Sequence, residues 1–200
     1  MKKALIMVLL LICVSAFGQQ VTYAVSPDQT SFKWIGYYLF SFGEHYGAIR
    51  VTKGNITATG DQISGGTFEV DMKSLADQDM EADNGGNDLS NHLKSTDFFD
   101  VDKFPTARFE ITQVEKIKDA QGKDPNYDIT GILTLKGVSN TLKFPAFVFV
   151  ENNVITSVAK FKFDRTKWNV RYNSGKFFSD VGDGAISDAI GVELTIKATK

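Results

Sequence analysis

Hydrophobic and polar side chains alternate along most of this chain. In residues 107–112, Ala, Phe and Ile alternate with Arg, Glu and Thr. Residues 127–135, 159–163 and 190–197 follow the same period of two. This period places the apolar side chains on one face of a β-strand and the polar ones on the other. We therefore predict an all-β fold in which the apolar faces of an antiparallel sheet meet in one interior.

The pattern predicts at least eight strands joined by short turns. They cover residues 21–25, 30–40, 48–52, 55–59, 65–72, 106–114, 127–136, 140–150, 154–164 and 190–198, and residues 168–172 could add another. Residues 53–55, Lys-Gly-Asn, are interpreted as a turn. So many closely spaced strands favour a closed eight-stranded barrel, because closure removes exposed strand edges.

One segment breaks the alternation. Residues 77–103 form a long crossover, and within it residues 88–94 are predicted to be a short helix because Leu89 and Leu93 share a helical face. Residues 144–150 are apolar on both faces of their predicted strand. We expect the outer face of that strand to be covered by the crossover helix or by a second subunit, so a homodimer is left open.

The first residues have the composition of an export signal. Lys2 and Lys3 precede an apolar run at residues 4–14, which is shorter than the ~20 residues that a membrane helix needs. We predict cleavage after Gly18. A lipoprotein anchored through Cys13 is the less favoured alternative, because Ile12 occupies the place of the expected small residue.

Two segments are therefore expected, a signal peptide at residues 1–18 and one domain at residues 19–200. The domain would be exported to the periplasm or beyond the cell, and it has no further apolar run long enough to cross a membrane. The chain has one cysteine, which would leave with the signal, so the exported domain depends on its core alone.

The charge balance argues against a nucleic-acid partner. Lys and Arg number 22 and Asp and Glu 24, which gives a formal net charge of −2. No run of Lys or Arg forms the basic patch that nucleic acids require.

The two histidines are weak candidates for chemistry. His45 and His92 lie far apart in the sequence without a metal-binding motif, although they could meet in space beside Asp71 or Asp97. We favour local structural roles and expect no metal. We also expect no cofactor and no catalytic residue, because no nucleophile motif is present.

An acidic stretch superficially resembles a calcium-binding loop. Its acids are Asp77, Asp79, Glu81, Asp83 and Asp88. Ala82 stands at the sixth position, where a glycine is required, and the twelfth position is not the usual Glu. A solvated acidic loop is the favoured interpretation.

A basic and aromatic stretch near the end of the chain is a candidate for the mouth of the barrel. Arg165 and Arg171 could present charge to a polar head group, with Trp168 and Tyr172 at the rim. The alternative is structural: an arginine that ties a hairpin corner and a buried tryptophan.

Several segments together resemble a known family. They are residues 45–47 (HYG), 68–75 (FEVDMKSL), 88–100 (DLSNHLKSTDFFD), 104–109 (FPTARF), 131–138 (GILTLKGV), 142–145 (LKFP) and 163–168 (FDRTKW). In this order they resemble the YceI-like family of exported lipid- and polyisoprenoid-binding proteins, over nearly the whole domain. The resemblance implies an extended, lipocalin-like antiparallel barrel with a helix against it and a long isoprenoid lipid in its lumen. It implies no reaction.

The alternation alone fits a filled core as well as a cavity. With the resemblance, we expect non-catalytic binding of a long apolar isoprenoid or quinone-like lipid, for transport, storage or sequestration. The predicted lumen residues are Phe32, Trp34, Phe68, Val70, Phe109, Ile111, Ile129, Leu133, Phe144, Phe161 and Phe163. One rival is an enzyme that uses the barrel as an apolar reaction chamber, with Asp71, His45 or His92 as its titratable groups. The other is a ligand-free, dimeric interaction module that uses residues 144–150.

Overall fold

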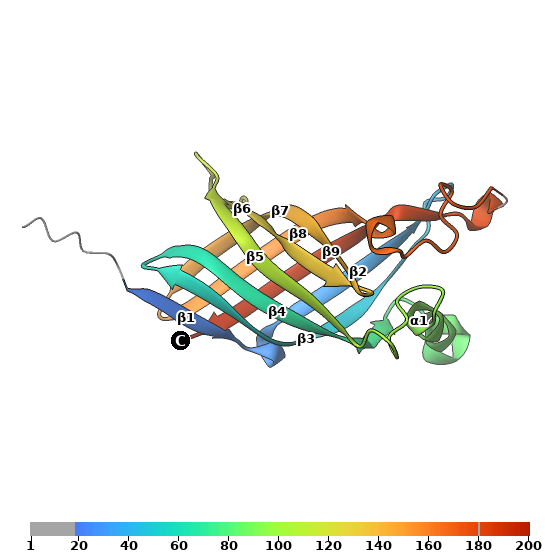
Figure 1. The fold of residues 1–200 in the computed structure, drawn as a ribbon, viewed down its shortest axis with the longest axis horizontal. Helices are drawn as coiled ribbons and strands as arrows, with labels where there is room; N and C mark the ends of the chain where they lie inside the picture. The colour runs from blue at the N-terminus through green and yellow to red at the C-terminus, as the bar shows by residue number, and fades with distance from the viewer. Residues whose placement is uncertain (1–18, 180) are drawn as a thin grey trace, which may run out of the picture.

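The computed structural model describes residues 19–179 and 181–200, and the predicted signal peptide lies outside this part of the chain. Within it, nine strands form one antiparallel sheet that closes on itself (Figure 1). The strands are β1 (Gln20–Val25), β2 (Ser31–Tyr38), β3 (Glu44–Thr59), β4 (Gln62–Asp77), β5 (Thr106–Lys116), β6 (Tyr127–Leu135), β7 (Val138–Glu151), β8 (Val154–Asp164) and β9 (Ile186–Thr199).

The nine strands fill eight positions around the barrel. β1 lies between β3 and β9, and after the short helix η1 (Pro27–Gln29) β2 continues between the same two strands. The barrel closes where β3 pairs with β4. The predicted all-β, eight-stranded antiparallel barrel with a short helical crossover is confirmed.

The predicted turn at residues 53–55 is wrong, because β3 runs straight through it. Gly54 lies within the strand, where a Cβ atom would come 2.6 Å from the carbonyl oxygen of Thr67 on β4. Glycine is needed here for the close approach of two backbones and not for a turn.

The additional strand considered at residues 168–172 is also absent from the described chain. The structure instead has a 3₁₀ helix, η3 (Arg165–Trp168), which ends at Asn169 in the left-handed region at φ 58°. Asp164 caps this helix by accepting a hydrogen bond from the backbone N–H of Thr166 at 2.9 Å.

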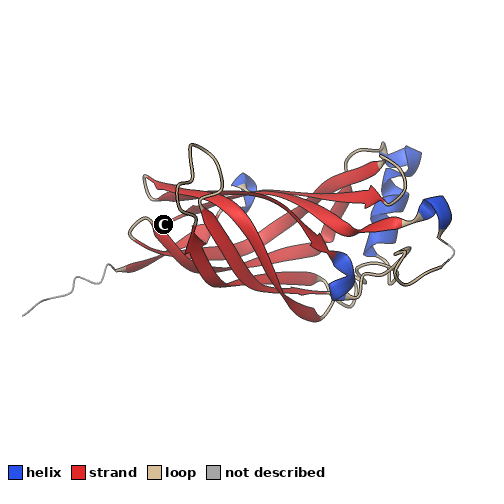
Figure 2. Cartoon of the chain, turned by 90° about the horizontal axis from the view of Figure 1, so that it is seen from above, coloured by secondary structure: helices blue, strands red, loops and turns tan. Residues whose placement is uncertain are grey.

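The two ends of the barrel differ in construction. At one end, which we call the hairpin end, connections without a helix at residues 60–61, 117–126 and 152–153 join the strands. The other end, the helical end, carries residues 39–43, 78–105, 136–137 and 165–185. Figure 2 shows most of the helical segments gathered there.

The crossover contains a π-helical turn, η2 (Ala82–Gly86), and the helix α1 (Asn87–Lys94). Ser90 ties this helix to the end of β4, because its hydroxyl accepts from the backbone N–H of Asp77 and donates to the carbonyl of Gly86, both at 2.8 Å. The expectation that the helix covers the outer face of residues 144–150, which belong to β7, is wrong. The helix lies against β4, and Phe149 on the outer face of β7 is 42% exposed. None of the described helices has the length and apolar character needed to cross a bilayer.

Candidate functional site

An apolar cavity of about 270 Å³ occupies the interior of the barrel. Side chains from all eight strand positions line it. A single buried water requires roughly 10–15 Å³ by the same kind of measure, so this interior is far from a filled core.

The structure places all eleven predicted lumen residues on the wall of this cavity. They are Phe32, Trp34, Phe68, Val70, Phe109, Ile111, Ile129, Leu133, Phe144, Phe161 and Phe163. The period of two therefore assigned the inward face correctly on every strand concerned. That these residues bind a lipid stays a prediction.

Four phenyl rings, from β4, β5, β7 and β8, form a continuous aromatic wall. The centroids of Phe68 and Phe109 lie 6.5 Å apart, and those of Phe109 and Phe144 lie 5.6 Å apart. Phe144 stacks on Phe161 at 4.2 Å with an interplanar angle of 11°. Such a wall offers large apolar area without demanding directional bonds from whatever lies against it.

The cavity is long as well as apolar. Its lining on β4 extends from Ile63 near the hairpin end to Leu75 near the helical end. This stretch is roughly 40 Å along the strand, and the usual tilt of barrel strands reduces it to about 30 Å along the axis. The shape suits an extended ligand better than a compact one.

At the helical end, α1 contributes to the cavity wall. Leu89 and Leu93, which share a helical face as predicted, line the cavity together with Phe98. The ring of His92 packs edge-on against Phe98 at 5.0 Å and against Tyr172 at 4.7 Å. This aromatic contact joins the helix to the segment that follows η3.

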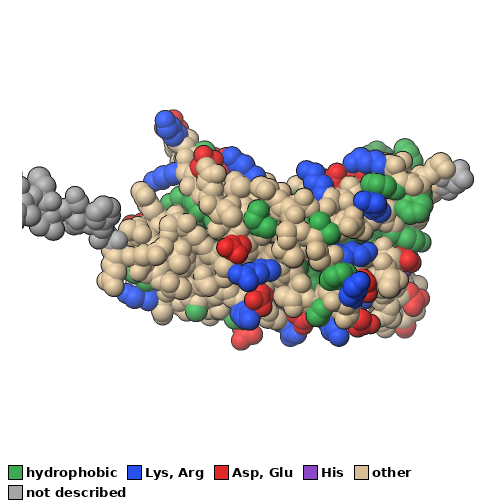
Figure 3. Space-filling model, in the orientation of Figure 1, with side chains coloured by type: hydrophobic (Ala, Val, Ile, Leu, Met, Phe, Trp, Pro, Cys, Tyr) green, Lys and Arg blue, Asp and Glu red, His purple; other side chains and the backbone are tan. Residues whose placement is uncertain are grey.

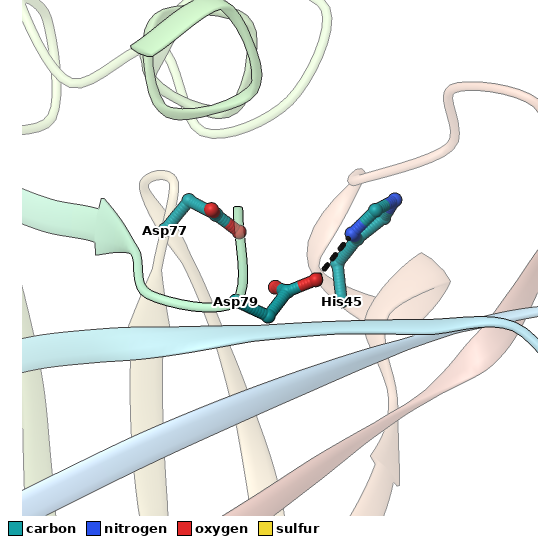
Figure 4. Close-up of side chains that lie close together, drawn as sticks. All are labelled: His45, Asp77 and Asp79. Atoms are coloured by element: carbon teal, nitrogen blue, oxygen red, sulfur yellow. Dashed lines mark hydrogen bonds and ion pairs between the residues drawn. The ribbon is translucent and has the colours of Figure 1, made fainter. Parts of the chain in front are cut away.

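A short chain of hydrogen bonds borders the same end of the cavity. The hydroxyl of Tyr38 lies 3.2 Å from Nε2 of His45, and Nδ1 of His45 lies 2.9 Å from Oδ2 of Asp79 (Figure 4). The other carboxylate oxygen of Asp79 accepts from the backbone N–H of Tyr46 at 2.7 Å. Tyr38 and His45 both line the cavity.

Asp77 completes a cluster in which ligand atoms of His45, Asp77 and Asp79 lie within 4.8 Å of one another. Burial raises the pKa of Asp77. Burial also acts to raise the pKa of Asp79, but the hydrogen bonds from His45 and Tyr46 outweigh it, so that pKa is lowered. An ionised Asp79 can only accept hydrogen bonds, so Nδ1 of His45 carries the hydrogen between them.

These contacts connect the start of β3 to the segment after β4. Hydrogen bonds already occupy Nδ1 of His45 and both oxygens of Asp79. Asp77 accepts from the backbone N–H of Met80 at 2.9 Å through Oδ1, and its Oδ2 is buried without a partner. Three side chains are one fewer than the four ligands of a closed zinc site.

The other acidic and histidine candidates lie apart from the cavity. Asp71 points outward and pairs with Arg50 at 3.1 Å, and His92 pairs with Asp97 at 3.1 Å. Of the three titratable groups named for an enzymatic barrel, only His45 lines the cavity. Three of the five acids of the supposed calcium loop, Glu81, Asp83 and Asp88, are exposed and outside the three-residue cluster.

Arg165 lines the cavity at the helical end, but backbone carbonyls occupy its guanidinium. It donates to the carbonyls of Val170, Tyr172, Ile186 and Ser187 at 2.8–3.2 Å. The residue is 1% exposed, and burial lowers its pKa. This guanidinium ties the segment after η3 to the start of β9, as the structural alternative proposed.

The remaining residues expected at the mouth do not line the cavity. Trp168 is 1% exposed and donates from Nε1 to the carbonyl of Leu133 at 2.8 Å. Tyr172 packs on His92, and Arg171 lies over the ring of Phe177 at 4.5 Å. A contact between these residues and a head group stays a prediction.

Comparison with known protein families agrees with the barrel fold described above. Residues 23–198 match the model of the YceI-like domain. The chain belongs to the YceI-like family. The resemblance inferred from the sequence motifs is confirmed.

Sequence relatives of this YceI-like chain are UPF0312 proteins. One from Pseudomonas putida (strain W619) is 27% identical over 157 residues, which cover 78% of this chain and 73% of the relative. One from Pectobacterium carotovorum subsp. carotovorum (strain PC1) is 35% identical over 116 residues, which cover 57% of this chain and 51% of the relative. The chain thus spans about half the length of that Pectobacterium protein.

Solved structures share the fold. The crystal structure of BcnA from Burkholderia cenocepacia has a TM-score of 0.65 at 17% identity, with 88% of this chain and 99% of that chain covered. A polyisoprenoid binding domain from Saccharophagus degradans, implicated in plant cell wall breakdown, has a TM-score of 0.58 at 10% identity, with 88% and 97% covered. At these identities the likeness shows the fold alone.

The sequence interpretation missed two features of the helical end. One is the Tyr38–His45–Asp79 chain, whose members come from three separate segments with no shared motif. The other is the run at residues 39–42, Leu-Phe-Ser-Phe, of which residues 39 and 40 were assigned to the end of a strand although it forms a loop. Consecutive apolar residues beside Gly43 were the signal that could have revealed this loop.

Proposed function

We propose that this YceI-like protein binds a long apolar lipid, isoprenoid or quinone-like, in its barrel and releases it unchanged. The observation that carries the proposal is the elongated cavity walled by phenyl and aliphatic side chains. The description of the related Saccharophagus degradans structure as a polyisoprenoid binding domain supports the choice of ligand class.

The energetics fit such a ligand. Burial of apolar surface stabilises by roughly 25 cal/mol per Å², so a long tail gains affinity in proportion to the length enclosed. An isoprenoid tail has no polar atoms that an aromatic wall would leave unsatisfied. A polar head would remain at the helical end, where Tyr38 and His45 border the cavity.

The proposal includes export of the lipid-binding domain. The composition of residues 1–18 supports this. N-terminal sequencing of the mature protein from a periplasmic or culture fraction tests it, and a first residue of Gln19 is the expected result.

The test of ligand binding is extraction of the purified protein with organic solvent, followed by mass spectrometry. An isoprenoid in about one-to-one ratio supports lipid binding. An empty extract, together with no uptake of a polyprenol or quinone offered in detergent, overturns it. A chemically altered lipid after incubation would favour the rival enzyme.

A matched pair of variants connects retention to the cavity. Phe161→Asp places a carboxylate on the cavity wall, whereas Phe149→Asp makes the same change on the outer face of the adjacent strand. We expect the first to abolish retention and the second to leave it intact. Phe161→Ala with circular dichroism on all three separates lost binding from lost folding, since it widens the cavity without burying a charge.

A further inference from the structure

The helical end exposes a group of large apolar side chains. Phe40 and Phe42, in the loop between β2 and β3, are 70% and 109% exposed. Leu39 from the same loop and Phe177 and Phe178 from the segment after η3 are also exposed. We call these five residues the apolar rim. Figure 3 shows hydrophobic side chains at this end of the molecule.

The two loops of the apolar rim are held side by side by the fold. The backbone N–H of Leu39 donates to the carbonyl of Ala185 at 2.8 Å, and Ile186 donates to Asn173 at 2.9 Å. A Cβ atom on Gly175 would lie 3.5 Å from the side chain of Leu39. The exposed rings therefore belong to one structured surface.

This surface adjoins the cavity. Tyr38, the residue before Leu39, is exposed on the outside and also lines the cavity. Ile186, which lies at the base of the second loop, lines it as well. A ligand that passes between the rim and the cavity would stay against apolar groups along its way.

Cationic side chains lie beside the rings of the apolar rim. Residues 167–179 contain three cationic side chains and no acidic one, Asp180 and Asp183 follow in the same segment, and Glu44 follows the first loop. Lys167 and Arg171 are exposed, and Arg171 stacks on the ring of Phe177, while Lys176 pairs with Asp164 and Asp188. Exposed Glu81, Asp83 and Asp88 belong to the crossover, at a different part of this end.

We propose that the apolar rim docks onto an anionic lipid bilayer and places the cavity entrance against it. Apolar rings that insert beside basic side chains are the physical basis of interfacial membrane binding. This inference rests on the proposed lipid binding, since a water-insoluble ligand has to be collected from a membrane. The fully exposed Phe42, in the five-residue loop between β2 and β3, suits insertion among lipid chains.

The experiment is co-flotation of the purified protein with vesicles of phosphatidylcholine alone or mixed with phosphatidylglycerol. We expect binding to the mixed vesicles that weakens with added salt. The double variant F40S/F42S should reduce it by about tenfold to a hundredfold, because two phenyl groups no longer leave water. Phe149→Ser, an exposed phenylalanine on the barrel wall, is the matched control and should bind like the unmodified protein.

Retention of a polyprenol loaded from detergent separates this inference from the proposed function. The double variant should load normally, because its changes lie outside the cavity. No flotation of the unmodified protein, or equal flotation of F40S/F42S, overturns membrane docking and leaves lipid binding intact. A dimer in light scattering that F40S/F42S converts to a monomer also overturns it, since a second copy would then cover the rim.

Discussion

The hairpin end and the helical end of the barrel close the same eight strand positions in different ways. At the hairpin end, turns that contain Gly, Asn and Asp join the strands, and Phe149, three residues before the turn at 152–153, is the exposed large apolar side chain near this end. The helical end carries a buried arginine, the Tyr38–His45–Asp79 chain and the apolar rim.

The helical end is therefore the one that departs from a simple connection of strands by tight turns. Turn residues with positive φ already supply a sufficient connection, as Asn152 and Asn153 do at φ 50° and 62°. Long segments and buried polar groups need compensating hydrogen bonds, so the larger number of both at the helical end points to a function there.

The largest effect is expected for Arg165→Ala at the helical end. The change leaves four carbonyls without their buried donor, and we expect a loss of about 3–5 kcal/mol in the free energy of unfolding. Denaturant unfolding measures it. Arg171→Ala, an exposed arginine at the same end, should stay within about 0.5 kcal/mol, and a similar loss in both would mean that burial is not the cause.

The next effect concerns the cavity. Gly36 lines it, and a Cβ atom there would meet no atom closer than 3.9 Å, so Gly36→Phe places a ring in open space near the helical end. The ring displaces on the order of 100 Å² of ligand contact, which lowers lipid affinity roughly a hundredfold. A lipid-binding titration measures the loss.

Val158→Phe on the outer wall of β8 is the control for Gly36→Phe, because it adds a ring at an exposed position. Its lipid affinity should match that of the unmodified protein. Normal affinity in Gly36→Phe would show that ligands do not occupy this part of the cavity.

Most of the barrel was predictable because alternation reports directly on which face of a strand is buried. Phe109, Phe144 and Phe161 all point inward as the pattern indicated. The error at Gly54 arose because a glycine inside a strand and one in a turn look alike in sequence. Only the folded structure, in which the carbonyl of Thr67 on β4 lies against Gly54, reveals the close approach.

The polar features of the helical end were less predictable, because they depend on contacts between distant segments. The sequence allowed two roles for Arg165, of which we favoured the structural one, and the carbonyls that select it come from Val170 to Ser187. Asp79 was grouped with an acidic loop by sequence proximity. Its actual partners lie on β3, more than thirty positions earlier.

A smaller, pH-dependent effect is expected for Asp79→Asn. The lowered pKa of Asp79 means that its ionised form stabilises the fold, and this contribution is present above about pH 4 and is lost as the pH falls through the folded-state pKa. We expect the variant to lose about 2 kcal/mol at neutral pH and the difference to shrink in acid.

Denaturant unfolding across pH checks this prediction, with Asp83→Asn as an exposed control from the same end. Asp77, whose pKa is raised by burial and also by its neighbour Asp79, contributes with the opposite sign, and Asp79→Asn removes the part of that contribution that comes from Asp79. A difference that stays constant down to low pH would contradict the role assigned to the Asp79 carboxylate.

The smallest effect is expected at the hairpin end. Asn153→Ala puts an ordinary side chain at φ 62° and should lower the free energy of unfolding by about 1 kcal/mol, whereas Asn153→Gly should not. Neither change should alter lipid retention or vesicle binding, because this turn is far from the apolar rim. Weaker vesicle binding by either variant would show that both ends take part in docking, and the contrast between them would then be structural only.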